Sequence, residues 1–246
     1  MRTIYWSFFT NSHWGVDNLD CITPLLDAGY NPLRRAAKES IELRKGATFL
    51  KCPAHTDFMK NVFVYQAPFD LTIDIETNNE TGDGKIFCEE LSQKQFEAIV
   101  DTRFLFEGQS GINPHPVIGI DWLVTFTAEK STQIQVMPAF MHYNDFTSKA
   151  FVVPGEYDIS KWTRPVELVF EVKSAKEKIY IKKGDALAYV KFNCDDTIKL
   201  EQQPVPWEET RICNEIRQTN KFRPLKERYK ALEEVRKTGC PYEPKN

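Results

Sequence analysis

The chain has 246 residues, of which 41% are hydrophobic, so it is long enough and apolar enough to bury a substantial core. Its 32 basic and 35 acidic residues are mixed along the sequence and give a formal net charge of −3. This composition excludes a disordered chain, and without a basic region it disfavours general binding to nucleic acid.

Residues 1–9 are apolar for only a short stretch before polar residues follow, which is too short for a signal sequence or a membrane span. We expect them to form a first strand. The six cysteines, at positions 21, 52, 88, 194, 213 and 240, include no C-x-x-C pair and no matching histidine spacing. They therefore predict neither a zinc knuckle nor a thioredoxin-type motif, and they favour a reduced, cytosolic protein.

Residues 32–45 carry the start and stop signals of a helix. Asn31 is a suitable N-cap, Pro32 stands at the first helical position, and Gly46 follows just past the end. The sequence therefore predicts one N-terminal helix over Pro32–Lys45.

Two further segments alternate between apolar and polar residues, as strands do. Residues 61–76 predict a strand pair bent at Pro68, because an interior strand cannot lose the amide donor that proline lacks. Residues 118–127 predict another strand, with Trp122 on its apolar side. Residues 92–100 are compatible with either a short helix or a loop.

The segment from 151 to 193 has the clearest pattern in the chain. Residues 166–172 have apolar side chains at every even position, whereas Glu167 and Glu171 fall on the other face. A turn at Gly184-Asp185 then leads into a strand over 186–192. These strands predict a mainly β fold, either a β-sandwich or a β-clip-like barrel.

The character of the sequence changes at Trp207. Residues 208–237 are densely charged with both signs and carry only a narrow apolar stripe, and Pro224 divides them into two helices. We therefore expect a β-rich domain over 1–206 and a charged helical C-terminal appendage over 207–246. Such a stripe would pack lightly on the body or on a partner.

The residues VPGEYD (153–158) and IKKGDALA (181–188) resemble the turn and strand pattern of dUTPase and dCTP-deaminase β-clip proteins. That resemblance implies that Asp158 occupies the place of the family's water-activating carboxylate. The family's Arg-Ser phosphate motif and its C-terminal glycine-rich arm have no counterpart here, so the carboxylate would lack donors for a triphosphate.

Several short segments resemble uncharacterised β-rich proteins of marine tailed phages, especially cyanophages, and of some bacteria. They are Ile4-Tyr5-Trp6, Lys51-Cys52-Pro53, NVFVYQAPFD (61–70) and Gly184-Asp185. The resemblance implies a phage origin, a location in the host cytoplasm or the virion, and a structural or interaction role.

Candidate metal ligands are few. His55 and Asp57 form an H-x-D pair that, with His142 and an arginine such as Arg164, would suit the facial triad and 2-oxoglutarate anchor of a non-haem iron oxygenase. A surface-loop histidine is the alternative for His55. His142 and Asp145 could form an acid and base couple, or a hydrogen-bonded structural pair.

Candidate binding residues lie in loops. His115 stands between two prolines, in a rigid turn that could present its imidazole to a ligand. Trp162, with cations at Lys161 and Arg164, could be an exposed contact site or a plug at the end of the sandwich. Cys52 and Cys88 are expected to be buried rather than nucleophilic.

We expect a non-catalytic structural or interaction protein without a cofactor. It would bind protein partners of the virion or the host through loops of the β body and the charged tail, away from membranes, and homo-oligomers are compatible with this role. The enzyme alternatives are a nucleotide-binding or nucleotide-hydrolysing β-clip protein centred on Asp158 and, third, an oxygenase using His55, Asp57 and His142.

Overall fold

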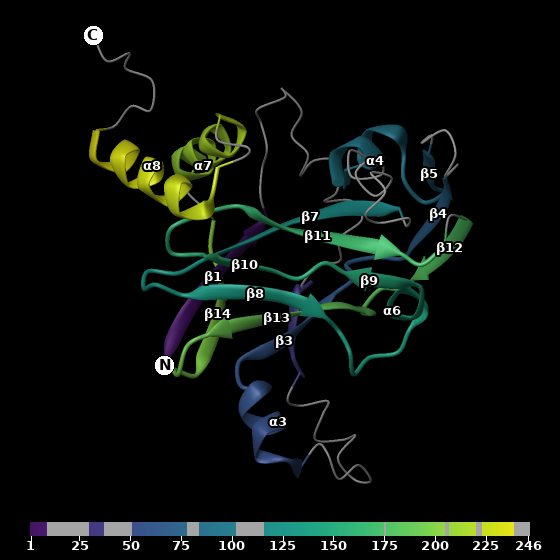
Figure 1. Ribbon diagram of the computed structural model, residues 1–246, viewed down its shortest axis with the longest axis horizontal. Helices are drawn as coiled ribbons and strands as arrows, with labels where there is room; N and C mark the ends of the chain where they lie inside the picture. Colours follow the sequence, from purple (N-terminus) through teal and green to yellow (C-terminus); the bar gives the residue numbers. More distant parts are fainter. Residues whose placement is uncertain are drawn as a thin grey trace.

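The computed structural model describes residues 1–8, 30–36, 51–77, 84–101, 116–174, 176–204, 207–219 and 223–238. The fold is mainly β, as predicted, and the described strands form three sheets (Figure 1). No helix among these residues is long and apolar enough to cross a membrane.

Sheet A has six strands, and all of its neighbours are antiparallel except the parallel pair β1 and β14. In spatial order its path is β14 (Ile198–Gln202), β1 (Arg2–Phe8), β7 (Val117–Thr127), β11 (Pro165–Val172) and β9 (Ala150–Val152), and β6 (Val100–Asp101) also pairs with β7.

Sheets B and C are antiparallel throughout. Sheet B runs in the order β10 (Gly155–Asp158), β8 (Gln133–Pro138), β13 (Ala186–Asn193), β3 (Val62–Gln66) and β2 (Leu33–Arg35). Sheet C consists of β12 (Lys176–Ile181), β4 (Leu71–Thr77) and β5 (Gly84–Cys88).

Sheets A and B pack face to face around one hydrophobic core. The ring of Phe192 on β13 meets Phe126 of sheet A edge-on at 5.7 Å and Phe63 of sheet B at 5.6 Å. The even positions of β11 are buried and its two glutamates are partly exposed, which confirms the alternation read from the sequence. A sandwich-like body follows from this arrangement.

The predicted start of the N-terminal helix is wrong. Residues Leu33–Arg35 form strand β2 and pair with β3, and Leu33 is buried against the core. The Asn31 side chain accepts a hydrogen bond from the Leu33 amide at 3.0 Å, so Asn31-Pro32 opens a turn into a strand. Residues 37–45 of the predicted helix lie outside the described residues.

In the described part of the chain, three short helices join the strands. Helix α3 (Pro53–Phe58) contains His55 and Asp57, which the sequence favoured as a loop. Helix α4 (Gln93–Ile99) begins with a capping box at Ser92, which settles the choice between helix and loop there, and α6 (Asp145–Lys149) begins with a capping box at Asn144.

The C-terminal segment forms the two predicted helices, α7 (Trp207–Thr219) and α8 (Leu225–Thr238), the second of which begins after Pro224. Both lie at one end of the β body, opposite sheet C (Figure 1). A separate apolar cluster attaches them to the body, and it consists of Trp162, Cys213, Ile216, Leu232 and Val235.

Candidate functional site

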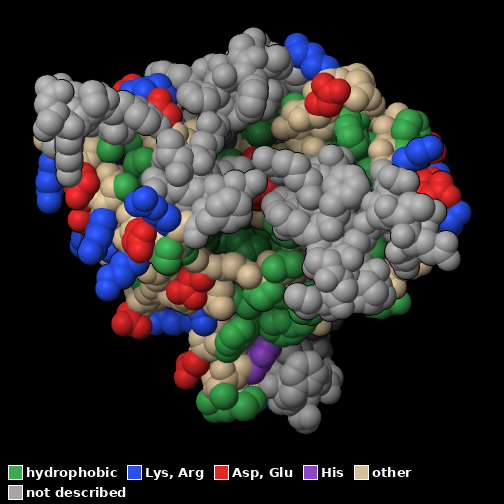
Figure 2. Space-filling view, turned by 45° about the horizontal axis from the view of Figure 1, so that its top comes forward, with side chains coloured by type: hydrophobic (Ala, Val, Ile, Leu, Met, Phe, Trp, Pro, Cys, Tyr) green, Lys and Arg blue, Asp and Glu red, His purple; other side chains and the backbone are tan. Residues whose placement is uncertain are grey.

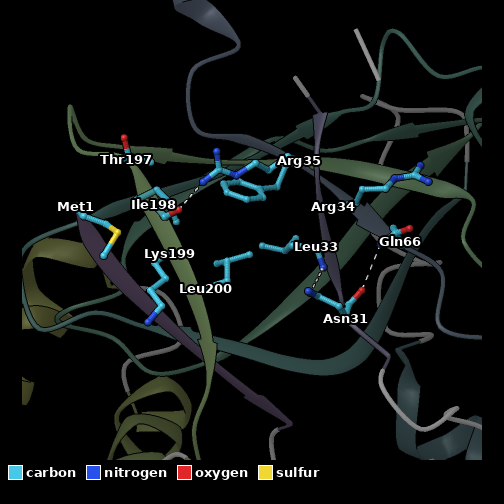
Figure 3. A pocket seen from close by; sticks show the side chains of 11 residues that line it. Met1, Asn31, Leu33, Arg34, Arg35, Gln66, Thr197, Ile198, Lys199 and Leu200 are labelled. Atoms are coloured by element: carbon cyan, nitrogen blue, oxygen red, sulfur yellow. Dashed lines mark hydrogen bonds between the residues drawn. The ribbon is translucent and has the colours of Figure 1, made fainter. Parts of the chain in front are cut away.

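A groove of about 750 Å³ separates β14, at one edge of sheet A, from β2, at one edge of sheet B (Figure 3). Its size is that of an ordinary ligand-binding site. Its lining residues are Met1, Asn31, Leu33, Arg34, Arg35, Phe63, Gln66, Thr197, Ile198, Lys199 and Leu200.

Hydrogen bonds hold the two walls of the groove. Arg35 Nη2 donates to the carbonyl oxygen of Ile198 at 2.7 Å and so links β2 to β14. The guanidinium carbon of Arg35 lies 5.9 Å from the centre of the Phe63 ring. On the far side, Gln66 Nε2 donates to the Asn31 carbonyl at 3.3 Å. The groove is therefore already shaped by the fold.

The groove is apolar at its centre and cationic at its rim. Leu33 and Leu200 point toward one another across it, whereas Lys199 points away from its centre (Figure 3). Among the described residues, its lining includes Arg34, Arg35 and Lys199 and no acidic residue. A hydrogen bond and an ion pair with Glu201 raise the pKa of Lys199, which keeps its ammonium group charged. The site suits a ligand that combines apolar groups with negative charge.

Exposed aromatic side chains form a second surface, here called the aromatic patch. It consists of Phe58, Phe140 and Tyr143, whose exposed fractions are 40%, 57% and 92%. The Phe58 and Phe140 ring centres are 6.1 Å apart, and Lys191 Nζ lies 4.6 Å from the Phe58 ring. Figure 2 shows hydrophobic side chains in a band that reaches the α3 end of the molecule. Exposed aromatics of this kind suit contact with another protein.

The prediction that Trp162 is an exposed contact residue is wrong. Only 1% of its surface is accessible, because it is packed between the body and the C-terminal helices. Its ring meets Tyr229 edge-on at 6.0 Å, and Arg228 lies over it at 5.3 Å. Trp162 instead matches the alternative interpretation, a structural plug at the end of the sandwich.

Asp158 is fully buried, and its carboxylate accepts hydrogen bonds both from the turn that follows it and from the turn before β8. Oδ1 accepts from the amide and hydroxyl of Ser160 at 2.9 and 2.6 Å and from the Thr132 amide at 3.3 Å, and Oδ2 accepts from the Ser131 hydroxyl at 2.7 Å. Burial raises the pKa of Asp158, but these hydrogen bonds outweigh burial and hold it below its ordinary value. A carboxylate bound in this way suits a structural role better than activation of water.

Arg164 lies in a polar cluster. Its Nη2 donates to Glu167 Oε2 at 3.3 Å, and its guanidinium carbon lies 5.6 Å from the Tyr157 ring. The other predicted binding residue, His115, lies outside the described residues.

The proposed iron ligands do not form a metal site. Among the described residues, no group of three or more His, Cys, Asp and Glu side chains could hold a metal ion, and this covers His55, Asp57 and His142. The ring Nδ1 of His142 instead lies 2.8 Å from the hydroxyl of buried Tyr189. Asp145 accepts from Lys149 Nζ and from the Tyr180 amide, which suits a structural role.

The four described cysteines are free, and their exposure differs. Cys88 is buried as predicted, whereas Cys52 is exposed, which corrects the expectation for that residue. Burial raises the pKa of Cys88 and of Cys213 to about 12, and acidic neighbours add to the increase.

We expect iodoacetamide to alkylate Cys52 rapidly in the native protein at mildly alkaline pH, and Cys88 and Cys213 only after unfolding. The reason is that only the thiolate reacts, and burial disfavours it. Peptide mapping by mass spectrometry measures each site. Equal native labelling of Cys52 and Cys88 would show that Cys88 is not held in the core.

The groove residues Leu33, Arg34 and Arg35 were missed from the sequence, because they fall in the predicted helix. No local pattern could reveal them, since the groove depends on β14, which lies more than 160 residues further along the chain. The chain matches no protein-family model, and comparisons with curated proteins and with solved structures find no match.

Proposed function

We propose that this chain is a non-catalytic interaction protein that binds an extended segment of a protein partner in the groove between β14 and β2. The observation that carries the proposal is the groove itself. Among the described strands, β14 pairs only with β1 and β2 only with β3, so each has one edge outside a ladder. Strand edges of this kind accept an added strand from another chain.

The lining of the groove suggests the chemistry of the partner segment. Side chains of an extended chain alternate in direction, so apolar residues could meet Leu33 and Leu200 while acidic residues meet Arg34 and Lys199. We therefore propose a segment in which apolar and acidic residues alternate. Charge complementarity of this kind favours association and fixes register more than it adds affinity.

Two other surfaces support an interaction role. The aromatic patch is exposed, and the outer faces of α7 and α8 carry charges of both signs on the side of the molecule that Figure 2 shows at the left. The resemblance to proteins of tailed phages makes a virion or host protein the partner that we propose. The β-clip enzyme alternative finds less support, because the carboxylate of Asp158 is buried and bound.

A displayed library of random peptides, panned on the purified protein, tests the groove. We expect the selected peptides to alternate apolar and acidic residues, and to bind the double variant Arg34→Glu, Lys199→Glu at least about tenfold more weakly. Affinities are measured by titration calorimetry with synthetic versions of the selected peptides.

The matched control is Lys226→Glu, Lys230→Glu, which makes the same change of charge on exposed positions of α8. It should retain full peptide affinity, and both double variants should unfold at the wild-type temperature. Selected peptides that bind the groove variant as tightly as the wild type would refute the proposal.

A further inference from the structure

One end of the groove between β14 and β2 is bridged by a side chain. The hydrogen bond from Arg35 Nη2 to the Ile198 carbonyl, here called the Arg35 bridge, runs from one wall to the other at 2.7 Å (Figure 3). Its guanidinium also lies over the Phe63 ring. A chain that lies along the groove meets this bridge and cannot pass it without breaking the bond. An extended segment therefore either ends at the bridge or displaces Arg35.

The backbone of β14 shows how far a segment can pair with this wall. The Arg2 amide donates to the Thr197 carbonyl at 2.9 Å, so the odd-numbered residues of β14 turn their backbone groups toward β1. The backbone groups of Leu200 and Gln202 point the other way, where no described strand pairs with them. The Ile198 carbonyl points the same way, and the Arg35 bridge occupies it. The edge of β14 can therefore pair with a new strand up to the bridge.

The edge of β2 is less complete. The Pro32 carbonyl accepts from the Gln66 amide of β3 at 3.0 Å. Alternation along the strand then turns the backbone groups of Leu33 and Arg35 away from β3. The Asn31 side chain already accepts the hydrogen bond of the Leu33 amide at 3.0 Å. An added strand would therefore pair with β14 and pack its side chains against β2.

The charge of Arg35 favours one direction of the added strand. β14 runs from Ile198, at the bridge, to Gln202. A segment antiparallel to β14 brings its C-terminal end to the bridge, whereas a parallel segment brings its N-terminal end there. A free C-terminal end is a carboxylate, which a guanidinium attracts, and a free N-terminal end is an ammonium group, which it repels. Described residues use one of the five N–H donors of Arg35, so donors remain for a carboxylate.

We propose that the groove binds the C-terminal end of its partner chain, antiparallel to β14 and with the terminal carboxylate on Arg35. This inference rests on the proposed function and specifies which part of the partner binds. The residue that pairs with Leu200 is apolar, because its side chain falls on the same face and meets Leu200 and Leu33. The carboxylate of the next residue turns toward the β2 wall, where Arg35 lies. Capture of a terminal carboxylate is a known mode of peptide recognition.

Two displayed libraries of random peptides, panned on the purified protein, test this inference. In one library the random residues end in a free carboxylate, and in the other a fixed flexible tail follows them. We expect enrichment from the free-end library. Synthetic versions of the selected peptides should bind at least about tenfold more weakly as C-terminal amides than as acids, because the amide loses the charged hydrogen bonds. Titration calorimetry measures both forms.

A charge-matched peptide controls for net charge. The amide form with one glutamate added at its N-terminal end has the net charge of the acid form. It should bind as weakly as the plain amide, because the position of the negative charge decides the affinity.

The variant Arg35→Met assigns the preference to the bridge. Methionine keeps a long apolar side chain and removes the charge, so the acid form should bind this variant about tenfold more weakly, and the amide form should bind it as it binds the wild type. Lys226→Met makes the same change on an exposed position of α8 and should retain both affinities. The comparison of acid and amide on the wild type needs no variant, so the test does not depend on the folding of Arg35→Met.

The possible failures are distinguishable. Equal binding of acid and amide to the wild type, or enrichment from the fixed-tail library alone, would overturn this inference and leave the groove as a site for internal segments. Equal weakening of both forms by Arg35→Met would overturn it as well, because Arg35 would then only hold the two walls together. Enrichment from neither library would refute the proposed function and this inference together.

Discussion

Replacing Trp162 with alanine is expected to detach the two C-terminal helices and to lower the free energy of unfolding by about 3–5 kcal/mol. The indole is the largest member of the cluster that attaches α7 and α8 to the body. The remaining attachments include a hydrogen bond from the Asp158 amide to the Tyr229 hydroxyl at 2.8 Å and one from Arg236 to the Lys161 carbonyl at 3.3 Å. Chemical denaturation measures the loss.

Limited proteolysis shows which part of the chain loses stability in Trp162→Ala. Trypsin should cut Trp162→Ala within α7 and α8 well before it cuts the β body, because an undocked helix of this length is marginally stable alone. The control is Leu225→Ala, which removes a 38% exposed apolar side chain from the same pair of helices and should change little. Equal protection of α7 and α8 in Trp162→Ala and the wild type would contradict the docking role.

Strands were the most predictable part of this fold. In β11 and β13 the side-chain pattern, the turn residues and the strand boundaries agree, and both strands lie in the core of the sandwich. The division of the C-terminal segment into two helices at Pro224 was equally clear, because proline lacks the backbone amide that would donate a hydrogen bond within a helix. Local chemistry alone decides such elements.

The segment after Asn31 shows where local chemistry is insufficient. Asn31-Pro32 opens a helix and a turn equally well, and Leu33–Arg35 became a strand because β3 offered an unpaired edge beside it. That edge belongs to residues about thirty positions further along the chain. The same long-range pairing creates the groove, so the sequence could predict neither.

Burial was the second quantity that the sequence could not supply. The polar neighbours of Trp162 suggested exposure, but α7 and α8 return from the end of the chain to cover it. The turn and strand pattern drew attention to Asp158, which ends strand β10, yet its burial depends on Ser131 and Tyr229, which are distant in sequence. A local motif identified the residue and gave no indication of its surroundings.

Asp158→Ala is expected to lower the free energy of unfolding by about 3–5 kcal/mol at neutral pH. The substitution leaves the Thr132 and Ser160 amides and the Ser131 hydroxyl without their acceptor in a buried site. Lys161, whose Nζ lies 3.6 Å from Oδ2, would lose its counter-ion as well. Thermal and urea unfolding of wild type and variant measure the difference.

The pH dependence of stability tests the same carboxylate. Because the folded pKa of Asp158 lies below its ordinary value of 3.8, its stabilising contribution is complete above that pH and is lost as the pH falls through the lower folded pKa. The stability difference between wild type and Asp158→Asn should therefore be full at neutral pH and shrink below pH 3.8. Glu76→Gln removes an exposed partner of Lys176 and should show a much smaller difference, because solvent screens that ion pair.

The same pair of variants decides between structure and catalysis at this position. A catalytic carboxylate is commonly dispensable for folding, so an enzyme centred on Asp158 would tolerate Asp158→Asn with unchanged stability. A carboxylate that receives two hydrogen bonds from Ser160 and two from Ser131 and Thr132 would not. An Asp158→Asn protein as stable as the wild type across this pH range would therefore favour the β-clip enzyme alternative, and a destabilised one would leave Asp158 as a structural link between β10 and the turn before β8.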